Sequence, residues 1–353
     1  MVSSGDSRGI STKRFCRWIP RSWSLLSPHA LPLLYSIHFS GAVAGMEFSR
    51  WRKRAHRGQD PTTLVCLTGD IDTGEENWES ELGPMLDVLA VHGVKMTIPV
   101  TADALHVHER KIARLADAGH EIAGHGDVHR GFLEPRQEQV RRLRSMLAAF
   151  EDRLGFRPTG FRAPYLLHNS ETYSALAEAG LGYDSSRVFR DPGSYLRALI
   201  GGGYAHPVRW QHLPRIWVRH VIGRSLPRPR LVAPGVVEFP VFDLDDWFFI
   251  DSPDGPRLTS DQSGVIADHW LRALGRFRRG RELVFVVQAH PGRMNRGLLG
   301  AVDTFLEGAR SWNAEFATLS EVRERLWADN RWRMRNGKPP DWIRATQAMG
   351  RRR

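Results

Sequence analysis

From Thr62 onward, the sequence alternates short apolar runs with longer segments whose apolar residues recur at helical spacing. The apolar runs predict buried strands, and repeated strand–helix units favour a mainly parallel sheet covered by helices, which can close into a barrel. We therefore expect an α/β fold. In such folds the loops that follow the carboxyl ends of the strands carry the chemistry.

The expected elements follow from periodicity and from the residues that begin and end helices. We expect strands at residues 64–68, 95–100, 121–123, 159–161, 236–242, 283–288 and 315–318. We expect helices at residues 80–92, 109–118, 135–154, 170–179, 301–311 and 321–327. Pro135 suits a first helical turn and Ser170 suits a helix cap, whereas Gly155 and Gly180 suit helix ends.

The net charge of +11 is concentrated in three parts of the chain. Residues 1–60 carry +7, residues 331–353 carry +7 and residues 187–230 carry +8, whereas the remainder carries −11. We therefore expect a basic N-terminal tail at 1–60, a catalytic domain at 61–330 with a basic insertion at 187–230, and a basic C-terminal tail at 331–353. Basic appendages of this kind favour contact with an anionic surface. The composition, 41% hydrophobic and 25% charged, excludes collagen, low-complexity disorder and a multi-span membrane protein.

The N-terminal region gives only a weak export signal. Basic residues at 8–21 precede a partly apolar stretch at 25–45 that contains Ala42-Val43-Ala44, which is typical of a cleavage site. Prolines and histidines interrupt this stretch, and Met46 offers a second start, so we slightly favour a cytoplasmic location. The two cysteines, Cys16 and Cys66, indicate no disulfide framework, and Cys66 is expected to be a core residue.

Five loops that follow expected strands contain polar side chains of clear chemical use. These side chains are Asp70 and Asp72; His125 and His129; Arg162 to Tyr165; Asp245 and Asp246 with Trp247; and His290. Two histidines and one aspartate form a common ligand set for a catalytic divalent metal. A second carboxylate can take a proton from an activated water, an arginine can keep that carboxylate ionised, and a further histidine can protonate a leaving group.

These motifs, in this order, resemble the polysaccharide deacetylase family, also called the NodB homology domain, over residues 62–325. The resemblance implies a distorted (β/α) barrel with fewer units than a complete TIM barrel, and a divalent metal, foremost Zn²⁺. The Asp70-Ile-Asp72 spacing, Gly126 and Pro291 are similar to the branch that includes peptidoglycan-deacetylase-like and allantoinase-like proteins. That branch is not confined to acetylated sugars.

The resemblance also implies a role for each motif residue. It makes Asp72, His125 and His129 the metal ligands and Asp70 the general base, which Arg162 tethers. The backbone N–H of Tyr165 would stabilise the oxyanion together with the metal. His290 would be the general acid, with Asp246 setting its charge state and Asp245 as the alternative. Trp247 and Pro164 would contact the substrate, and Asp127 is expected to be a loop acid rather than a ligand.

The sequence therefore predicts a metal-dependent hydrolase of a non-peptide carbon–nitrogen bond, foremost an N-deacetylase of a sugar or glycan. A cyclic amide or imide hydrolase is the alternative within enzymes. A basic membrane- or polyanion-binding module on an inactive barrel is the alternative of another class. We expect a small-molecule or glycan substrate, contact of the basic tails with an anionic surface and no specific nucleic-acid partner.

Overall fold

Parallel strand pairing dominates the structure, which is a computed structural model. It describes residues 62–73, 78–190, 227–252, 258–259, 262–278 and 284–329. The chain divides into two units, Met1–Asp60 and Pro61–Arg353, and every described residue belongs to the second. The predicted tails and residues 191–226 of the predicted insertion lie outside the described residues.

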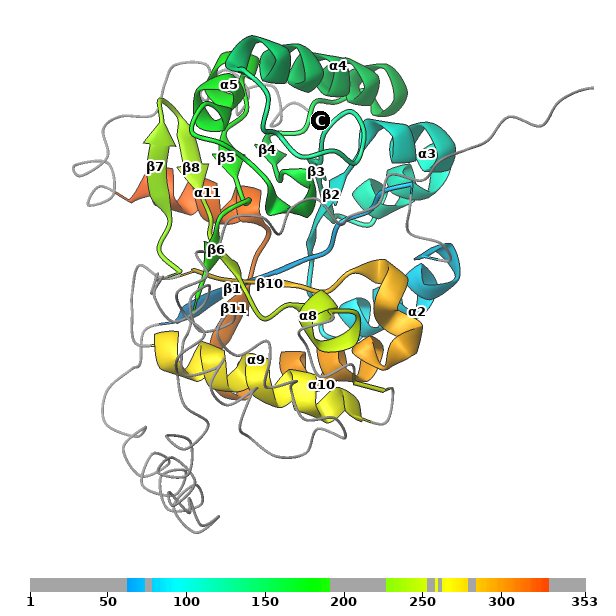
Figure 1. Cartoon of the computed structure of the whole chain (residues 1–353). Coiled ribbons are helices and arrows are strands. Elements are labelled where there is room, and N and C mark those ends of the chain that lie inside the picture. The colour runs from blue at the N-terminus through cyan, green and yellow to red at the C-terminus, as the bar shows by residue number, and fades with distance from the viewer. Residues whose placement is uncertain are drawn as a thin grey trace, which may run out of the picture. The chain divides into compact units, whose positions relative to one another are not determined.

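Within the described residues, eleven strands form one sheet (Figure 1). The strands are β1 (Thr63–Thr68), β2 (Thr97–Val100), β3 (Glu121–Gly124), β4 (Gly160–Phe161), β5 (Tyr183–Asp184), β6 (Val188–Phe189), β7 (Arg230–Ala233), β8 (Val236–Glu238), β9 (Val241–Phe242), β10 (Val284–Gln288) and β11 (Ala314–Phe316). Their order is β6-β9-β10-β1-β2-β3-β4-β5-β8-β7, with β11 beside β1. All neighbours are parallel except β7 and β8.

Strand β1 lies at the centre of this order and diverges from one of its neighbours. On one side it pairs with β10 over Leu64–Thr68. On the other side β11 pairs with its first half, whereas β2 pairs with it only at Thr68. The sheet therefore curls into a partial barrel with edges at β6 and β7, as the predicted distorted (β/α) barrel requires.

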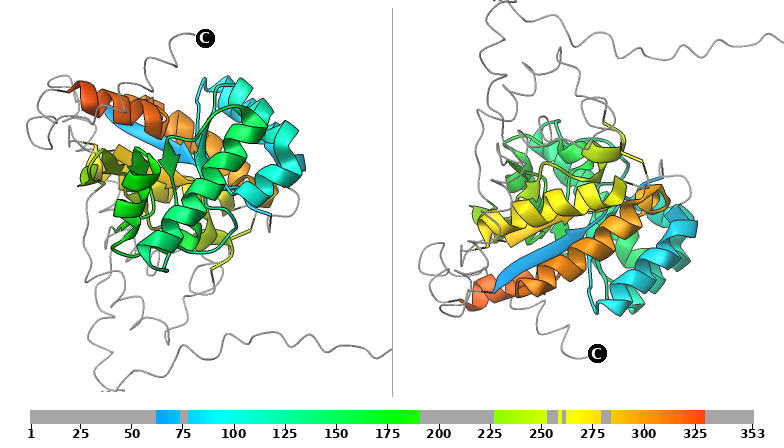
Figure 2. Two further views of the ribbon diagram at one scale, coloured as in Figure 1. Left: turned by 90° about the horizontal axis from the view of Figure 1, so that it is seen from above. Right: turned by 90° about the horizontal axis from the view of Figure 1, so that it is seen from below.

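Helices cover the outside of the curled sheet (Figure 1). They are α2 (Trp78–Val91), α3 (Ala102–Asp117), α4 (Arg136–Leu154), α5 (Thr172–Ala179), α8 (Asp246–Ile250), α9 (Ser263–Phe277), α10 (Leu298–Ser311) and α11 (Leu319–Ala328), with short 3₁₀ helices at Pro164–Leu166 and Pro291–Arg296. Helix α4 packs against α3 and α5, and α10 packs against α9 and α2. Helices α9 and α10 pack against each other below the strands in Figure 1, and the view from below in Figure 2 shows both helices. No helix among the described residues is long and apolar enough to cross a membrane.

The central strands are buried on both faces, which explains their continuous apolar sequences. All residues of β10 are buried, and Cys66 of β1 is a free, fully buried thiol, which confirms its predicted place in the core. Parallel sheets covered by helices produce this pattern because neither face meets water. The tightly held strand ends can therefore position side chains precisely.

The structure differs from the predicted elements where local signals are weak. Helix α3 begins at Ala102, seven residues earlier than predicted, because the Thr101 side chain accepts a hydrogen bond from the Ala104 amide at 3.3 Å and caps it. Helix α5 begins at Thr172 after Glu171, so the predicted Ser170 cap is wrong. Helices α8 and α9 were not predicted. The two-residue strands β5 and β6 are too short for periodicity, and β6 lies within the predicted insertion 187–230.

Two acidic side chains meet inside the sheet. Asp184 of β5 is in register with Glu238 of β8, and both are fully buried. Asp184 accepts hydrogen bonds from the Ser186 hydroxyl at 2.7 Å and the Ser186 amide at 3.2 Å. Burial first, and the Asp184 charge second, raise the pKa of Glu238 well above its ordinary value of 4.5. Burial therefore favours the protonated form of the Glu238 carboxyl in the folded protein.

This buried proton predicts that the free energy of unfolding depends on pH. Above pH 4.5 the unfolded chain releases a proton that the folded chain retains, so stability falls as pH rises toward the raised folded pKa of Glu238. Glu238→Gln keeps a donor at this position without a titrating proton. We expect the variant to gain stability over the wild type between pH 5 and pH 8 in urea unfolding. Glu307→Gln, at an exposed position of α10, is the control. An equal pH slope in the wild type and in Glu238→Gln would contradict this interpretation.

Candidate active site

The carboxyl ends of β1, β3, β4, β9 and β10 bring most of the predicted site residues together. Asp70 follows β1, His125 follows β3, Arg162 follows β4 and His290 follows β10. Arg162, His125 and His290 all lie close to the Asp70 carboxylate. The sheet therefore assembles residues that are up to 220 positions apart in the sequence.

Arg162 and Asp70 form a buried ion pair. Arg162 is fully buried, and its Nη1 lies 2.7 Å from Asp70 Oδ1 and 3.0 Å from Thr68 Oγ1. The rest of the guanidinium donates to the Ser185 carbonyl and hydroxyl, each at 3.0 Å. Burial raises the pKa of Asp70, but Arg162, followed by His125, outweighs this effect and holds the pKa well below its ordinary value. The carboxylate is therefore ionised and fixed in direction.

The second oxygen of Asp70 faces two imidazoles and an amide. Asp70 Oδ2 accepts a hydrogen bond from Gln288 Nε2 at 3.2 Å. It also lies 3.7 Å from His125 Nε2 and 3.8 Å from His290 Nε2. Sequence reasoning missed Gln288 and Ser185. The one sequence signal for Gln288 is that a polar residue occupies the last position of a buried apolar strand, where its side chain can face the site.

His125 is oriented by the backbone beside it. Its Nδ1 lies 2.8 Å from the Arg162 carbonyl, which accepts a hydrogen bond only if Nδ1 carries the proton. Nε2 then carries a lone pair, and this nitrogen is buried without a hydrogen-bond partner among the described residues. Burial lowers the pKa of His125 to about 4, so the ring is neutral near pH 7. A neutral imidazole with a fixed tautomer and an unused lone pair suits a metal ligand.

The backbone conformation at position 126, directly after His125, favours glycine. Its φ is +96°, and a Cβ there would lie 3.2 Å from both the Phe132 ring and the Val128 carbonyl. A serine or threonine would be strained at this position. The glycine therefore fits the turn that separates His125 from His129.

His129 pairs with the other carboxylate of the first loop. His129 Nδ1 lies 3.3 Å from Asp72 Oδ2, and the Tyr165 ring lies over His129 with centroids 4.3 Å apart. The His125 and His129 rings are 5.3 Å apart. Bonds of about 2.1 Å at a tetrahedral zinc ion would place two ligand atoms about 3.4 Å apart. The Asp72–His129 separation agrees with that spacing.

The three predicted ligands do not form a closed ligand set. No group of three histidine, cysteine, aspartate or glutamate side chains within the described ranges is close enough to hold an ion. Asp72 pairs with His129, whereas His125 faces Asp70. The donor chemistry and the unused His125 lone pair fit a divalent metal, and the assignment of Asp72, His125 and His129 as its ligands stays a prediction.

The paired acids after β9 have different orientations. Asp246 is fully buried, and its Oδ1 lies 2.8 Å from His290 Nδ1 while its Oδ2 accepts from the His290 amide at 2.9 Å. Asp245 instead caps α8, accepting a hydrogen bond from the Phe248 amide at 2.9 Å. The structure therefore selects Asp246, rather than the alternative Asp245, as the partner of His290. Burial lowers the pKa of His290, but Asp246 and Asp70 outweigh it and raise the pKa well above its ordinary value.

The remaining predicted residues lie around this centre with different exposure. Tyr165 has a left-handed backbone at φ 57° and is 65% exposed. Trp247 is 46% exposed on α8. Pro164 is buried next to Gly126, so it supports the loops of the site. The catalytic role of Tyr165 and the substrate contacts of Trp247 and Pro164 stay predictions.

A second buried arginine anchors the loop that carries His129. Arg142 of α4 is fully buried, and its Nε donates to Asp127 Oδ1 at 2.8 Å. Its Nη1 donates to Glu134 Oε1 at 2.5 Å, and the guanidinium also donates to the Gly131 and Arg130 carbonyls, each at 3.0 Å. Asp127 is thus a loop acid paired with Arg142, as expected. The guanidinium holds both ends of residues 127–134 and so fixes the loop.

Comparison with known proteins identifies the domain. Residues 58–183 match the model of the polysaccharide deacetylase family. A peptidoglycan deacetylase-like protein of Gibberella zeae is 26% identical over 285 residues, which are 75% of this chain and 80% of that protein. The chain carries a polysaccharide deacetylase domain.

Solved structures share the fold. A protein of Mycobacterium smegmatis, described as a polysaccharide deacetylase, superposes with a TM-score of 0.57 and 24% identity, covering 76% of this chain and 91% of that one. The PuuE allantoinase superposes with a TM-score of 0.56 and 15% identity, covering 78% of this chain and 94% of that one. At these identities the likeness concerns the fold, and it supports the distorted (β/α) barrel.

The Asp246–His290 contact predicts a measurable titration. Asp246→Asn removes the charge that most strongly favours protonated His290, so we expect the pKa of His290 to fall by at least about one unit. Imidazole ¹⁵N resonances of the full chain, assigned by their loss in His290→Gln, report this pKa. Asp303→Asn, which removes the carboxylate beside His92, serves as the control. An unchanged His290 titration in Asp246→Asn would contradict the pairing.

The Arg142 cluster predicts a large loss of stability on substitution. Arg142→Met leaves the carboxylates of Asp127 and Glu134 without their shared partner, and we expect a loss of about 3 kcal/mol. Arg141→Met is the matched control, because Arg141 is an exposed neighbour whose pair with Glu138 is screened by solvent and adds little stability. Urea unfolding measures both. Equal losses in the two variants would contradict a special role for Arg142.

Proposed function

We propose that the chain is a metal-dependent hydrolase that removes the N-acetyl group from an acetylated sugar or glycan. The polysaccharide deacetylase domain supports the reaction class. The single observation that carries the mechanism is the position of Asp70, whose carboxylate is fixed by Arg162 and faces both His125 and His290. A base, an acid and a candidate metal ligand thus surround one small region.

The metal would be held by Asp72, His125 and His129. It would supply Lewis-acid polarisation of the amide carbonyl and of the attacking water. His125 supports this assignment through its buried, unpartnered Nε2 and its Nδ1 contact with the Arg162 carbonyl. Zn²⁺ accepts this mixture of imidazole and carboxylate ligands.

Asp70 would act as the general base. Its Oδ1 is held by Arg162, so Oδ2 is the atom that takes a proton from water as the water oxygen attacks the carbonyl carbon. The Tyr165 backbone N–H would donate to the developing oxyanion. Gln288, which donates to Oδ2, would help to orient the same carboxylate.

His290 would complete the reaction as the general acid. Asp246 keeps its imidazole protonated, and Nε2 is the ring atom nearest Asp70. The carbon–nitrogen bond breaks as Nε2 donates its proton to the departing nitrogen, which leaves as an amine. The other product is acetate, and the water supplies its new oxygen.

A cyclic amide or imide hydrolase is the second candidate. The same base and acid would open a ring by the same attack, without releasing a separate amine. The Asp70-Ile-Asp72 spacing and the fold shared with an allantoinase favour keeping this reaction in the test. An anionic-surface contact of the basic tails and a cytoplasmic location are further proposals, and they concern residues outside those described.

The function is tested by a substrate screen with the full chain loaded with Zn²⁺. We expect acetate release from acetylated glycans, loss of activity on chelation and recovery on adding zinc. Asp70→Asn should lower the rate by at least about 100-fold, because it removes the proton acceptor. Asp87→Asn, at an exposed position of α2, is the matched control, and circular dichroism checks folding.

Each alternative has its own result in this screen. Turnover of cyclic ureides or imides without acetate release would select the second candidate. Failure of purified protein to retain metal, or full activity in Asp70→Asn, would overturn the proposed mechanism.

A further inference from the structure

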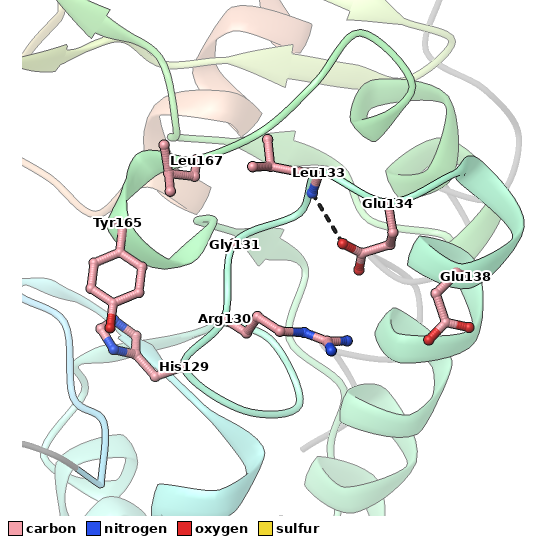
Figure 3. Close-up of a pocket in the computed structure, with 8 residues that line it drawn as sticks. All are labelled: His129, Arg130, Gly131, Leu133, Glu134, Glu138, Tyr165 and Leu167. Carbon is pink, nitrogen blue, oxygen red and sulfur yellow. Dashed lines mark hydrogen bonds between the residues drawn. The ribbon is translucent and has the colours of Figure 1, made fainter. Parts of the chain in front are cut away.

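A cavity of about 500 Å³ adjoins the candidate active site. Its lining residues, which Figure 3 draws, are His129, Arg130, Gly131, Leu133, Glu134, Glu138, Tyr165 and Leu167. His129 and Tyr165 belong to the site and also form one wall of the cavity. A substrate that reacts at the site can therefore extend a second group into this space.

The walls of the cavity include apolar side chains that face solvent. Leu133 is 59% exposed, Leu167 is 47% exposed and the Tyr165 ring is 65% exposed. Figure 3 shows the two leucines near each other, with Tyr165 at the end next to His129. Exposed apolar groups gathered beside a reactive centre favour a ligand that covers them.

The acceptor atoms of the cavity are already used. One Glu138 oxygen accepts a hydrogen bond from Arg141 Nε at 2.8 Å, and the other accepts one from Arg141 Nη2 at 2.5 Å. Glu134 Oε1 accepts a hydrogen bond from Arg142, and Glu134 Oε2 accepts one from the Leu133 amide at 3.0 Å. Each of the two carboxylates is therefore paired with an arginine, so its negative charge opposes an acidic ligand less than an unpaired carboxylate would.

Arg130 is the available donor. It is exposed, and its guanidinium makes no hydrogen bond or close ion pair to another described side chain, although its charge acts on Glu138 and its carbonyl accepts from Arg142. Figure 3 shows its side chain running from the loop along the cavity toward Glu138. A planar guanidinium with unused donors pairs best with a carboxylate, which accepts two parallel hydrogen bonds.

We propose that this cavity is a specificity pocket for a substrate arm that carries a carboxylate on a short apolar linker. Arg130 binds the carboxylate, and Leu133, Leu167 and Tyr165 cover the linker. The inference rests on the proposed function, because it places the hydrolysed bond beside His129. It narrows the substrate class to an acylated or cyclic amide that also bears an acidic group.

The test measures binding in metal-free protein, so that it does not depend on catalysis. Chelator is removed by gel filtration, and the full chain is titrated with pentanoate and with pentanamide by ligand-observed NMR. The two probes share one apolar chain and differ in the carboxylate. We expect pentanoate to bind at least about fivefold more tightly than pentanamide, and we expect Arg130→Gln to abolish this preference.

Two further variants make the test specific. Arg114→Gln, at an exposed position near the end of α3, should leave the preference unchanged. Leu167→Ala should weaken the binding of pentanoate and pentanamide equally, because it removes apolar contact without changing charge. Arg130→Gln is expected to fold, since Arg142 binds the carbonyl of residue 130 rather than its side chain.

The outcomes separate this inference from the proposed function. Equal binding of pentanoate to the wild type and to Arg130→Gln overturns the pocket assignment, whatever the screen of substrates gives. An Arg130-dependent preference supports the pocket even if no acetate release is found, in which case the proposed reaction fails alone.

Discussion

The buried pair between Arg162 and Asp70 is the interaction on which the site depends. The two residues follow β4 and β1, which are separated in the sheet by β2 and β3, so the guanidinium reaches between strand ends that do not touch. An unpaired charge at either position would be strongly destabilising in this interior. The same arginine also fixes His125, because its carbonyl lies 2.8 Å from Nδ1 of that imidazole. One residue therefore orients both the proposed base and a proposed ligand.

Much of this arrangement could be predicted from sequence, since the long strands have continuous apolar runs and polar motifs follow them. The contacts that complete the site could not. Ser185 and Gln288 lie at the ends of strands and carry no motif, and their role depends on which strands become neighbours. The choice between Asp245 and Asp246 depended on α8, a five-residue helix too short to show periodicity. Only tertiary packing decides which of two adjacent acids turns inward.

Reaction and selectivity are divided between two neighbouring regions. The strand ends hold the groups that would transfer protons, whereas the loop of residues 127–134 and the turn around Tyr165 shape the adjoining cavity. Arg142 connects the two, because it fixes the loop that presents His129 to the site and Arg130 to the cavity. A change in this loop could therefore alter substrate choice while the Asp70–Arg162 pair stays intact.

The most direct test of the account is anomalous X-ray scattering at the zinc edge from crystals of the full chain grown with Zn²⁺. If His125, Asp72 and His129 hold the metal, a strong peak is expected within about 2.1 Å of His125 Nε2, with Asp72 and His129 as the other protein ligands. Absence of a peak at His125, or a peak coordinated by other side chains, would contradict the assignment of the metal and the mechanism built on it.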